Sequence, residues 1–218
     1  MAEFEAARPG LLCDAFVRRA ALAIIVGYAA YVGGWAIGGT IRRDYDPFRG
    51  AISELFELGA PWSSRGWVVA GLLLSGLALL GFGPALHRGL PGRGRLGPVL
   101  VMVAGVFTLL VLASPCSPGC PGKSAAWNDT AHTWTATVVY VTLGLAPLAF
   151  AWRLRRLAPA LAALSLTMGG VAALGFAVRY LGVLPGPKGL QQRVIHIVAD
   201  LWYLLLAIRF LRGRSARD

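Results

Sequence analysis

Three polar side chains recur at helical spacing inside an apolar stretch near the end of the chain. Arg193, His196 and Asp200 are three, four and seven positions apart, so a helix places them on one face. Asp200 lies near the middle of that stretch, where an ionisable residue costs about 2.5–3.5 kcal/mol if the helix spans a membrane. Its carboxyl group must therefore have a partner or be protonated, and a protonated carboxyl can act as an acid catalyst.

A second group of titratable side chains stands at the start of another apolar stretch. Asp129 and His132 are one helical turn apart, and an amphipathic segment earlier in the chain can bring Glu54 or Glu57 to the same place. We expect Glu54, Asp129 and His132 to converge with His196 and Asp200 on one cavity suited to general acid/base chemistry or to a hard or borderline metal ion. No metal ligand is assigned, because neither stretch matches a known metal-binding motif. Asp129 also suits the alternative role of a helix N-cap.

Cationic and aromatic residues near these groups could hold a hydrophobic substrate. The predicted substrate-binding residues are Arg179, Arg193, Trp134, Trp202 and Tyr203. Two alternatives stay open. Aromatic residues at the ends of membrane spans commonly form interfacial belts. Arg193 or Arg179 can also pair with Asp200 in a buried network that only orders the helices.

The elements that position these residues are predicted to be membrane-spanning helices. Of the 218 residues, 56% are hydrophobic and only 14% are charged, and the mean hydropathy is +0.63, a balance untypical of a water-soluble domain. A bilayer core about 30 Å thick needs about 20 apolar residues. The sequence therefore predicts an all-α, polytopic helical bundle forming a single transmembrane domain over 1–218, with spans at about 20–39, 66–86, 96–114, 131–152, 157–179 and 190–210.

The positive charge is distributed unequally between the two sides of the predicted bundle. The net charge is +11, and 13 of the 21 Lys and Arg residues flank the chain ends and the loops 87–95 and 153–156. This bias predicts that both termini lie in the cytoplasm and that the cavity opens on the extracytoplasmic side. The expected location is a bacterial inner membrane. Nucleic acid is excluded as a partner, because the chain has no recognition helix and no basic stretch interleaved with aromatic residues.

Two of the three cysteines lie close together in a loop rich in Pro and Gly. Cys116 and Cys120 belong to the segment Ser114-Pro115-Cys116-Ser117-Pro118-Gly119-Cys120-Pro121, which the predicted topology places in an oxidising compartment. We expect a local disulfide. The alternative is a redox dithiol or a metal pair, but redox pairs usually have two intervening residues rather than three.

Several short motifs resemble a known family. They are Ile52-Ser53-Glu54-Leu55, Leu58-Gly59-Ala60-Pro61, the Cys/Pro loop before His132, and Gly189-Leu190-Gln191-Gln192-Arg193 at the start of the last span. With the six-span pattern they resemble the bacterial domain-of-unknown-function family 998 over nearly the whole chain. Phe56 and Glu57 separate the first two motifs, a departure that affects the geometry around Glu54. The resemblance implies a six-helix fold and no established activity.

Two looser similarities concern chemistry. His196 and Asp200 match in part the helical spacing of membrane hydrolases that hold zinc with His and Asp, although an Asp replaces the usual second His. Asp200 beside Trp202 is similar to the arrangement in small membrane terpene cyclases, where a carboxylic acid protonates an isoprenoid and aromatic rings shelter the cation.

We therefore expect a membrane enzyme that acts on a lipid or isoprenoid substrate, by cyclisation or by hydrolysis. The expected partners are membrane lipids and a hydrophobic small molecule, whereas the cofactor and the oligomeric state are left open. The alternative is a non-enzymatic lipid-binding, transport or accessory protein whose polar residues are structural. A transporter is typically built from two related halves with broken helices, and the sequence contains no such repeat.

Overall fold

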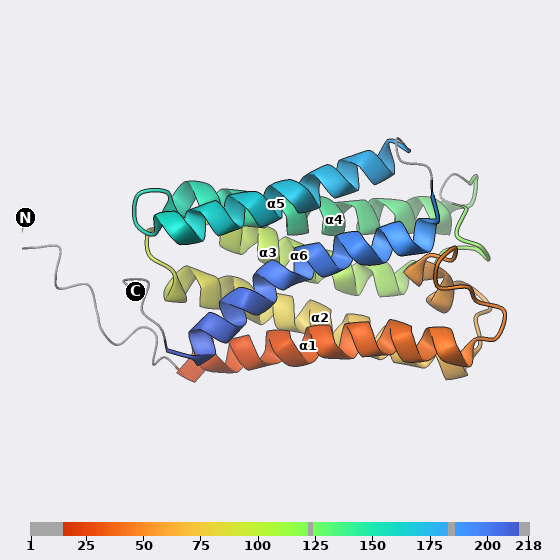
Figure 1. Cartoon of the computed structure of the whole chain (residues 1–218). Coiled ribbons are helices and arrows are strands. Elements are labelled where there is room, and N and C mark those ends of the chain that lie inside the picture. The colour runs from red at the N-terminus through yellow and green to blue at the C-terminus, as the bar shows by residue number, and fades with distance from the viewer. Residues whose placement is uncertain (1–14, 122–123, 183–185, 214–218) are drawn as a thin grey trace, which may run out of the picture.

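The computed structural model describes residues 15–121, 124–182 and 186–213, and in this part of the chain all regular structure is helical. Each predicted span coincides with one long helix, which confirms the all-α fold with six helices (Figure 1). A short 3-10 helix, η3, lies between the first two. The elements are α1 (Ala15–Ile41), η3 (Ile52–Phe56), α2 (Trp62–Gly89), α3 (Leu96–Ala113), α4 (Trp127–Leu154), α5 (Pro159–Tyr180) and α6 (Lys188–Leu211).

All six long helices are long and apolar enough to cross a membrane. The shortest, α3, has 18 residues and so extends about 27 Å. Large apolar side chains such as Leu22, Val26, Leu77 and Val99 point outward and are about half exposed. A surface of this kind requires lipid as its solvent, so the chain is a multi-pass membrane protein.

Some helices extend beyond the predicted spans because backbone hydrogen bonding continues past the hydrocarbon layer. Helix α2 begins at Trp62 rather than near residue 66, and α4 begins at Trp127 rather than near 131. Helix α5 begins later than predicted, at Pro159. Proline suits the first turn of a helix because its φ angle is preset and its missing N–H leaves no bond unmade.

Close contact between α1 and α2 depends on small residues. A methyl group added at Gly34 would lie 2.4 Å from the carbonyl oxygen of Trp67, and one added at Gly71 would lie 2.7 Å from that of Ala30. Only glycine permits this approach of the two backbones, as in many membrane helix pairs. The tight α1–α2 pair forms one wall of the bundle.

The two ends of the bundle are built differently (Figure 1). The long-loop end, on the right, holds the connections 42–61, 114–126 and 181–187. The short-loop end, on the left, holds the turns 90–95 and 155–158, the start of α1 and the end of α6.

One side chain holds the short-loop end together. The guanidinium group of Arg153, at the end of α4, donates hydrogen bonds of 2.5–3.2 Å to five backbone carbonyl oxygens around the α2–α3 turn, those of His87, Leu90, Pro91, Gly92 and Gly94. This arginine counted toward the positive charge of a cytoplasmic loop in the sequence. The structure gives it the additional task of satisfying carbonyl groups that the turn leaves without helical partners.

Candidate functional site

The polar face of α6 lies inside the bundle. Arg193, His196 and Asp200 are 7%, 8% and 4% exposed, so all three point away from lipid, as the sequence pattern indicated. Their surroundings differ from one another. Each therefore has a separate structural or chemical role.

Asp200 is the residue with the fewest partners. Both oxygens of its carboxyl group are buried, and neither forms a hydrogen bond of ordinary geometry with a described residue. The hydroxyl group of Tyr28, on α1, lies near enough to interact electrostatically with the carboxyl group, and so does that of Tyr203. The Tyr28 hydroxyl also lacks a hydrogen bond of ordinary geometry. An acid and a phenol thus face each other deep in the bundle with unused hydrogen-bonding capacity.

His196, one turn before Asp200, is surrounded by aromatic rings from three other helices. Its ring centre lies 5.6 Å from that of Tyr31 on α1, 5.0 Å from Tyr140 on α4 and 6.4 Å from Phe176 on α5, all in edge-to-face geometry. Such contacts favour the positive edge of one ring against the negative face of another. The imidazole group is therefore held in a mostly apolar cage.

Arg193 contacts the 42–51 loop and does not pair with Asp200. Its guanidinium group donates hydrogen bonds to the carbonyl oxygens of Pro47 and Gly50 and to the hydroxyl group of Tyr45, and it lies over the ring of Trp35. The ion pairs in the described part of the chain all lie within residues 42–57. Pairing of Asp200 with an arginine, one of the alternatives from the sequence, is therefore wrong.

Arg179 serves a different contact as well. It is half-buried at the end of α5, and its guanidinium group donates to the side-chain oxygen of Gln191 at 3.3 Å. This contact joins α5 to the first turn of α6. The residue predicted to bind substrate thus contributes to helix packing in this structure.

The start of α6 binds the α1–α2 loop through several groups at once. The backbone N–H groups of Gly189 and Leu190 donate to carbonyl oxygens of the loop, and Gln192 accepts from the N–H of Ile52 at 2.8 Å while donating to the Tyr140 hydroxyl at 2.6 Å. A methyl group at Gly189 would lie 2.2 Å from the carbonyl oxygen of Gly50. Glycine is required here because two backbones meet.

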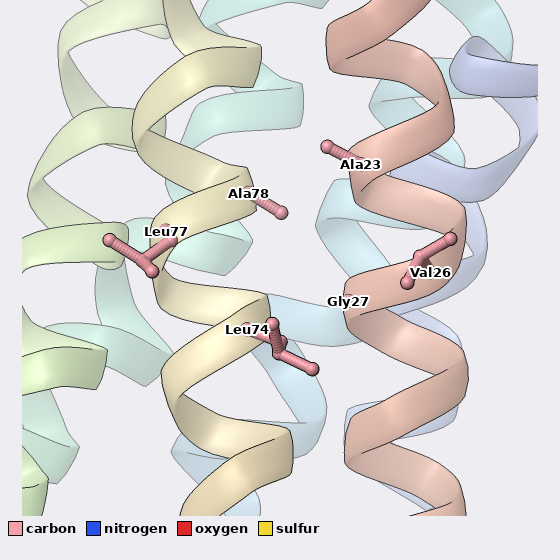
Figure 2. A pocket seen from close by; sticks show the side chains of 6 residues that line it. All are labelled: Ala23, Val26, Gly27, Leu74, Leu77 and Ala78. Carbon is pink, nitrogen blue, oxygen red and sulfur yellow. The ribbon is translucent and has the colours of Figure 1, made fainter.

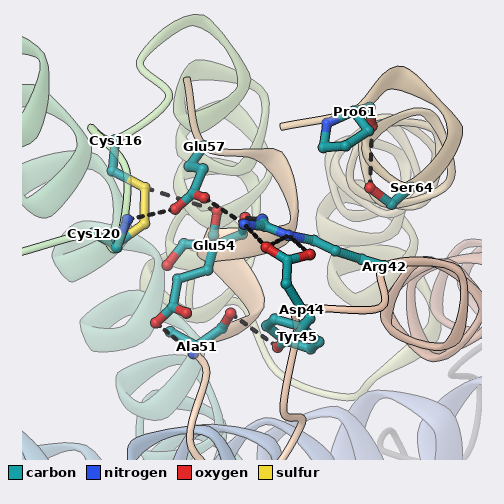
Figure 3. A network of polar contacts seen from close by, with 12 residues as sticks. Arg42, Asp44, Tyr45, Ala51, Glu54, Glu57, Pro61, Ser64, Cys116 and Cys120 are labelled. Atoms are coloured by element: carbon teal, nitrogen blue, oxygen red, sulfur yellow. Dashed lines mark hydrogen bonds and ion pairs between the residues drawn. A yellow bond between two sulfur atoms is a disulfide. The ribbon is translucent and has the colours of Figure 1, made fainter. Parts of the chain in front are cut away.

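A second polar network joins the 42–61 loop to the 114–126 loop (Figure 3). Arg42 pairs with the buried carboxylate of Glu57 at 2.8 Å and with the exposed carboxylate of Asp44 at 3.2 Å. The other Glu57 oxygen accepts a hydrogen bond of 2.7 Å from the N–H of Gly119, inside the loop closed by the Cys116–Cys120 disulfide. The expected disulfide is therefore present, and its loop is held against η3.

The pKa values of Asp44 and Tyr45, in this region, are shifted from their ordinary values. The hydrogen bond from Arg42 holds the pKa of Asp44 below its ordinary value. Burial raises the pKa of Tyr45, although its contact with Arg193 acts in the opposite direction. Both groups lie in the loop outside the membrane-spanning helices.

Asp129, His132 and Glu54 take part in this loop structure rather than in a cavity with Asp200. Asp129 accepts a hydrogen bond of 2.6 Å from the N–H of Ser117, and His132 donates from Nδ1 to the carbonyl oxygen of Ser114 at 2.8 Å. Glu54 accepts from the N–H of Ala51. No group of three or more potential metal ligands occurs among the described residues. The predicted site residues thus fall into two groups. We call Glu54, Asp129 and His132 the loop set, and Arg193, His196 and Asp200 the α6 set.

The N-cap alternative for Asp129 is also wrong. Helix α4 begins after Ala126, so Asp129 is the third residue of the helix. At that position its carboxylate still interacts favourably with the helix N-terminus. Its hydrogen bond to Ser117 adds a connection between the second long loop and α4.

The comparison with known families agrees with this architecture. A family described as "Protein of unknown function (DUF998)" matches residues 25–209. The chain belongs to this family. No curated protein and no solved structure matches it. The DUF998 match begins within α1 and ends within α6, so it contains both the loop set and the α6 set.

The aromatic residues assigned to substrate binding are divided in this DUF998 member. Trp202 and Tyr203 are fully buried; the indole N–H of Trp202 donates to the Ser165 hydroxyl, and the Tyr203 hydroxyl donates to the carbonyl oxygen of Leu143. Trp134 is 67% exposed on the outer face of α4 and does not line the interior. Trp134 therefore lies apart from the buried polar residues of α6.

Three tyrosines were missed by the sequence analysis. Tyr28, Tyr31 and Tyr140 come from α1 and α4, so no spacing along the chain relates them to α6. The available signal was only that each is a polar aromatic residue inside an apolar span. Their role follows from the packing that brings α1, α4 and α6 together.

An apolar crevice opens on the outer surface between α1 and α2 (Figure 2). Its volume is about 240 Å³, and its lining residues are Ala23, Val26, Gly27, Leu74, Leu77 and Ala78. Val26 and Leu77 are more than half exposed at its rim. Gly27 precedes Tyr28 in the sequence, so the crevice lies on the outer side of the helix that carries this tyrosine.

Proposed function

We propose that the chain is an integral membrane enzyme that protonates an isoprenoid or another unsaturated lipid, with Asp200 as the proton donor. The observation that carries this proposal is a fully buried carboxyl group that has no cationic partner among the described residues and faces only the hydroxyl groups of tyrosines. A structural carboxylate in a bilayer is normally paired with a cation, because an unpaired one is costly. A buried carboxyl group without a cationic partner is suited to reversible proton transfer.

The surroundings of Asp200 suit a cationic intermediate. Tyr28 and Tyr203 adjoin the carboxyl group, while Tyr31 and Tyr140 surround His196 one turn away. Aromatic faces attract cations through the ring quadrupole, and the burial of this region excludes water that would trap a carbocation. Hydrolysis would need a water molecule beside the carboxyl group, which the buried aromatic surroundings disfavour, so this environment favours the isoprenoid chemistry over hydrolysis.

The proposed reaction is balanced without a further reactant. The carboxyl group transfers its proton to one carbon of a double bond, which leaves a carboxylate and a carbocation. A second double bond attacks the cation and closes a ring. Loss of a proton from the neighbouring carbon to the Asp200 carboxylate forms a new double bond and restores the acid. Substrate and product are isomers.

Deuterium provides a direct test. Membranes containing the chain are incubated in D₂O with a polyprenyl lipid, and the lipids are then analysed by mass spectrometry. Because Asp200 exchanges its proton with solvent between turnovers, we expect a product that carries one carbon-bound deuterium. Hydrolysis would instead give fragments without carbon-bound deuterium.

The matched variants are Asp200→Asn and Asp129→Asn. Asp200→Asn should abolish deuterium incorporation without lowering the melting temperature, because the amide keeps the shape of the side chain and its carbonyl oxygen still faces the Tyr28 hydroxyl group. Asp129→Asn should keep the incorporation but lower the melting temperature, because an anionic acceptor for the Ser117 N–H is replaced by a neutral one. Incorporation that persists in Asp200→Asn would overturn the proposal. If wild type shows no turnover and Asp200→Asn lowers the melting temperature, the result would favour a non-enzymatic protein.

We also propose the orientation in the bilayer: the short-loop end in the cytoplasm and the long-loop end outside, in a bacterial inner membrane. The disulfide at the long-loop end supports this, since disulfides persist in oxidising compartments. The arginine bias supports it too, although Arg8, Lys123, Arg214 and Arg217 lie outside the described residues. Reporter fusions in the 90–95 turn should be cytoplasmic, and an external signal there would reverse the assignment.

A further inference from the structure

The short-loop end carries a concentration of positive charge. The described residues at this end include ten basic side chains and no Asp or Glu, and eight of the ten are exposed. They are Arg18, Arg19, Arg88, Arg93, Arg95, Arg153, Arg155, Arg156, Arg209 and Arg212, of which Arg153 and Arg209 are half-buried. We define seven of these exposed residues as the arginine surface: Arg18, Arg19, Arg93, Arg95, Arg155, Arg156 and Arg212.

The long-loop end has a nearly balanced charge by comparison. Its described residues include seven basic side chains and five acidic ones. Arg42 and Arg49 pair with neighbouring carboxylates, and Arg193 is buried against loop carbonyl oxygens. Arg153, at the short-loop end, is also excluded from the arginine surface, because its guanidinium group already donates to the α2–α3 turn. The two ends therefore differ in the number of exposed cations that a partner could contact.

The chemistry of the arginine surface is specific. All ten basic residues are arginine, and the guanidinium group offers parallel N–H donors that fit the two oxygens of a phosphate. Arg155 lies 3.4 Å from the ring centre of Trp152, which is 70% exposed, and Arg88 lies 4.6 Å from that of Phe16. Aromatic side chains at such a level occupy the interface between lipid tails and headgroups.

We infer that the arginine surface binds the phosphate groups of anionic phospholipids in the adjoining leaflet. The partner is a lipid and not a soluble phosphate, because the exposed apolar side chains Trp152 and Leu157 place these arginines beside the acyl region. The seven cations belong to the first turns of α1, to the α2–α3 and α4–α5 turns and to the residue after α6, so they fit several headgroups rather than one. The inference is independent of catalysis at Asp200.

The test measures lipid preference of the full purified chain. Native mass spectrometry in detergent gives apparent affinities for phosphatidylglycerol and for phosphatidylcholine with the same acyl chains. We expect wild type to prefer the anionic lipid. In the double variant Arg155→Gln with Arg156→Gln, that preference should fall about tenfold or more, because each charge near an anionic surface contributes roughly fivefold to affinity. The preference should also fall as salt increases.

The matched control replaces two exposed cations of the long-loop end, Arg43→Gln with Lys188→Gln, and should leave the preference unchanged. If the Arg155 and Arg156 variant does not fold, Arg93→Gln with Arg95→Gln tests the same surface from the opposite turn. Equal binding of the two lipids by wild type would overturn the inference. Equal loss in the variant and the control would also overturn it, because general net charge would then explain the preference.

Discussion

The two ends of the bundle satisfy the backbone hydrogen-bonding groups of their loops in different ways. At the long-loop end, many side chains from four segments each satisfy one or two backbone groups, and basic and acidic side chains occur in similar numbers. At the short-loop end, Arg153 alone satisfies five carbonyl oxygens, and most of the other arginines are exposed. Long loops therefore need a distributed network, whereas a tight turn can be held by one guanidinium group. Among the described residues, the long-loop end therefore has nearly balanced charge, whereas the short-loop end is strongly positive.

Arg193→Met should give the largest loss of stability. It removes a buried cation with three hydrogen-bond acceptors and leaves the carbonyl oxygens of Pro47 and Gly50 with fewer donors. We expect a loss of about 3 kcal/mol or more and a marked fall in the melting temperature in detergent. An unchanged melting temperature would show that the α1–α2 loop does not depend on α6.

Arg153→Met should give the second largest effect. The methionine keeps much of the side-chain packing against the turn but donates no hydrogen bond, so five carbonyl oxygens lose a partner. Water can reach part of this turn, and we therefore expect a loss of about 2 kcal/mol. Arg95→Met is the control, since Arg95 is exposed in the same turn. Equal effects of the two changes would contradict the role assigned to Arg153.

The disulfide should have an effect of similar or smaller size. In the chain-entropy description, closing a loop of about five residues stabilises the fold by roughly 2 kcal/mol. Cys116→Ser with Cys120→Ser should lower the melting temperature accordingly and should weaken the contact between Glu57 and Gly119. Mass spectrometry after alkylation, with and without reductant, checks the bond itself. Two free thiols in protein purified without reductant would contradict it.

Asp44→Asn should give the smallest change, and the change should depend on pH. Arg42 lowers the pKa of Asp44 in the folded chain, so the ionised carboxylate contributes stability above the ordinary pKa of about 3.8. That contribution is lost as the pH falls through the lowered value. The small difference between wild type and Asp44→Asn should therefore be present at pH 7 and absent near pH 2. A difference that is constant with pH would exclude the Arg42 pair as its cause.

The sequence predicted the architecture well and the candidate site only in part. Six apolar stretches of sufficient length allow little besides six helices, and the spacing of Arg193, His196 and Asp200 fixes which face of α6 avoids lipid. The grouping of Glu54, Asp129 and His132 with Asp200 was not found. Those three side chains bond to nearby loop backbone, and the loop conformation that offers these N–H and carbonyl groups has no periodic pattern to predict it.

What the sequence by itself determined follows from local physics. Helix length is set by the bilayer, and burial of the α6 face is set by the cost of exposing charge to lipid. The tertiary structure alone decided the partners. Arg193 meets Pro47 across 146 positions of the chain, and Asp200 meets Tyr28 rather than an arginine. Such contacts depend on which helices are neighbours and how each is rotated about its axis. The packing of small residues between helices and the contacts of the loops determine both.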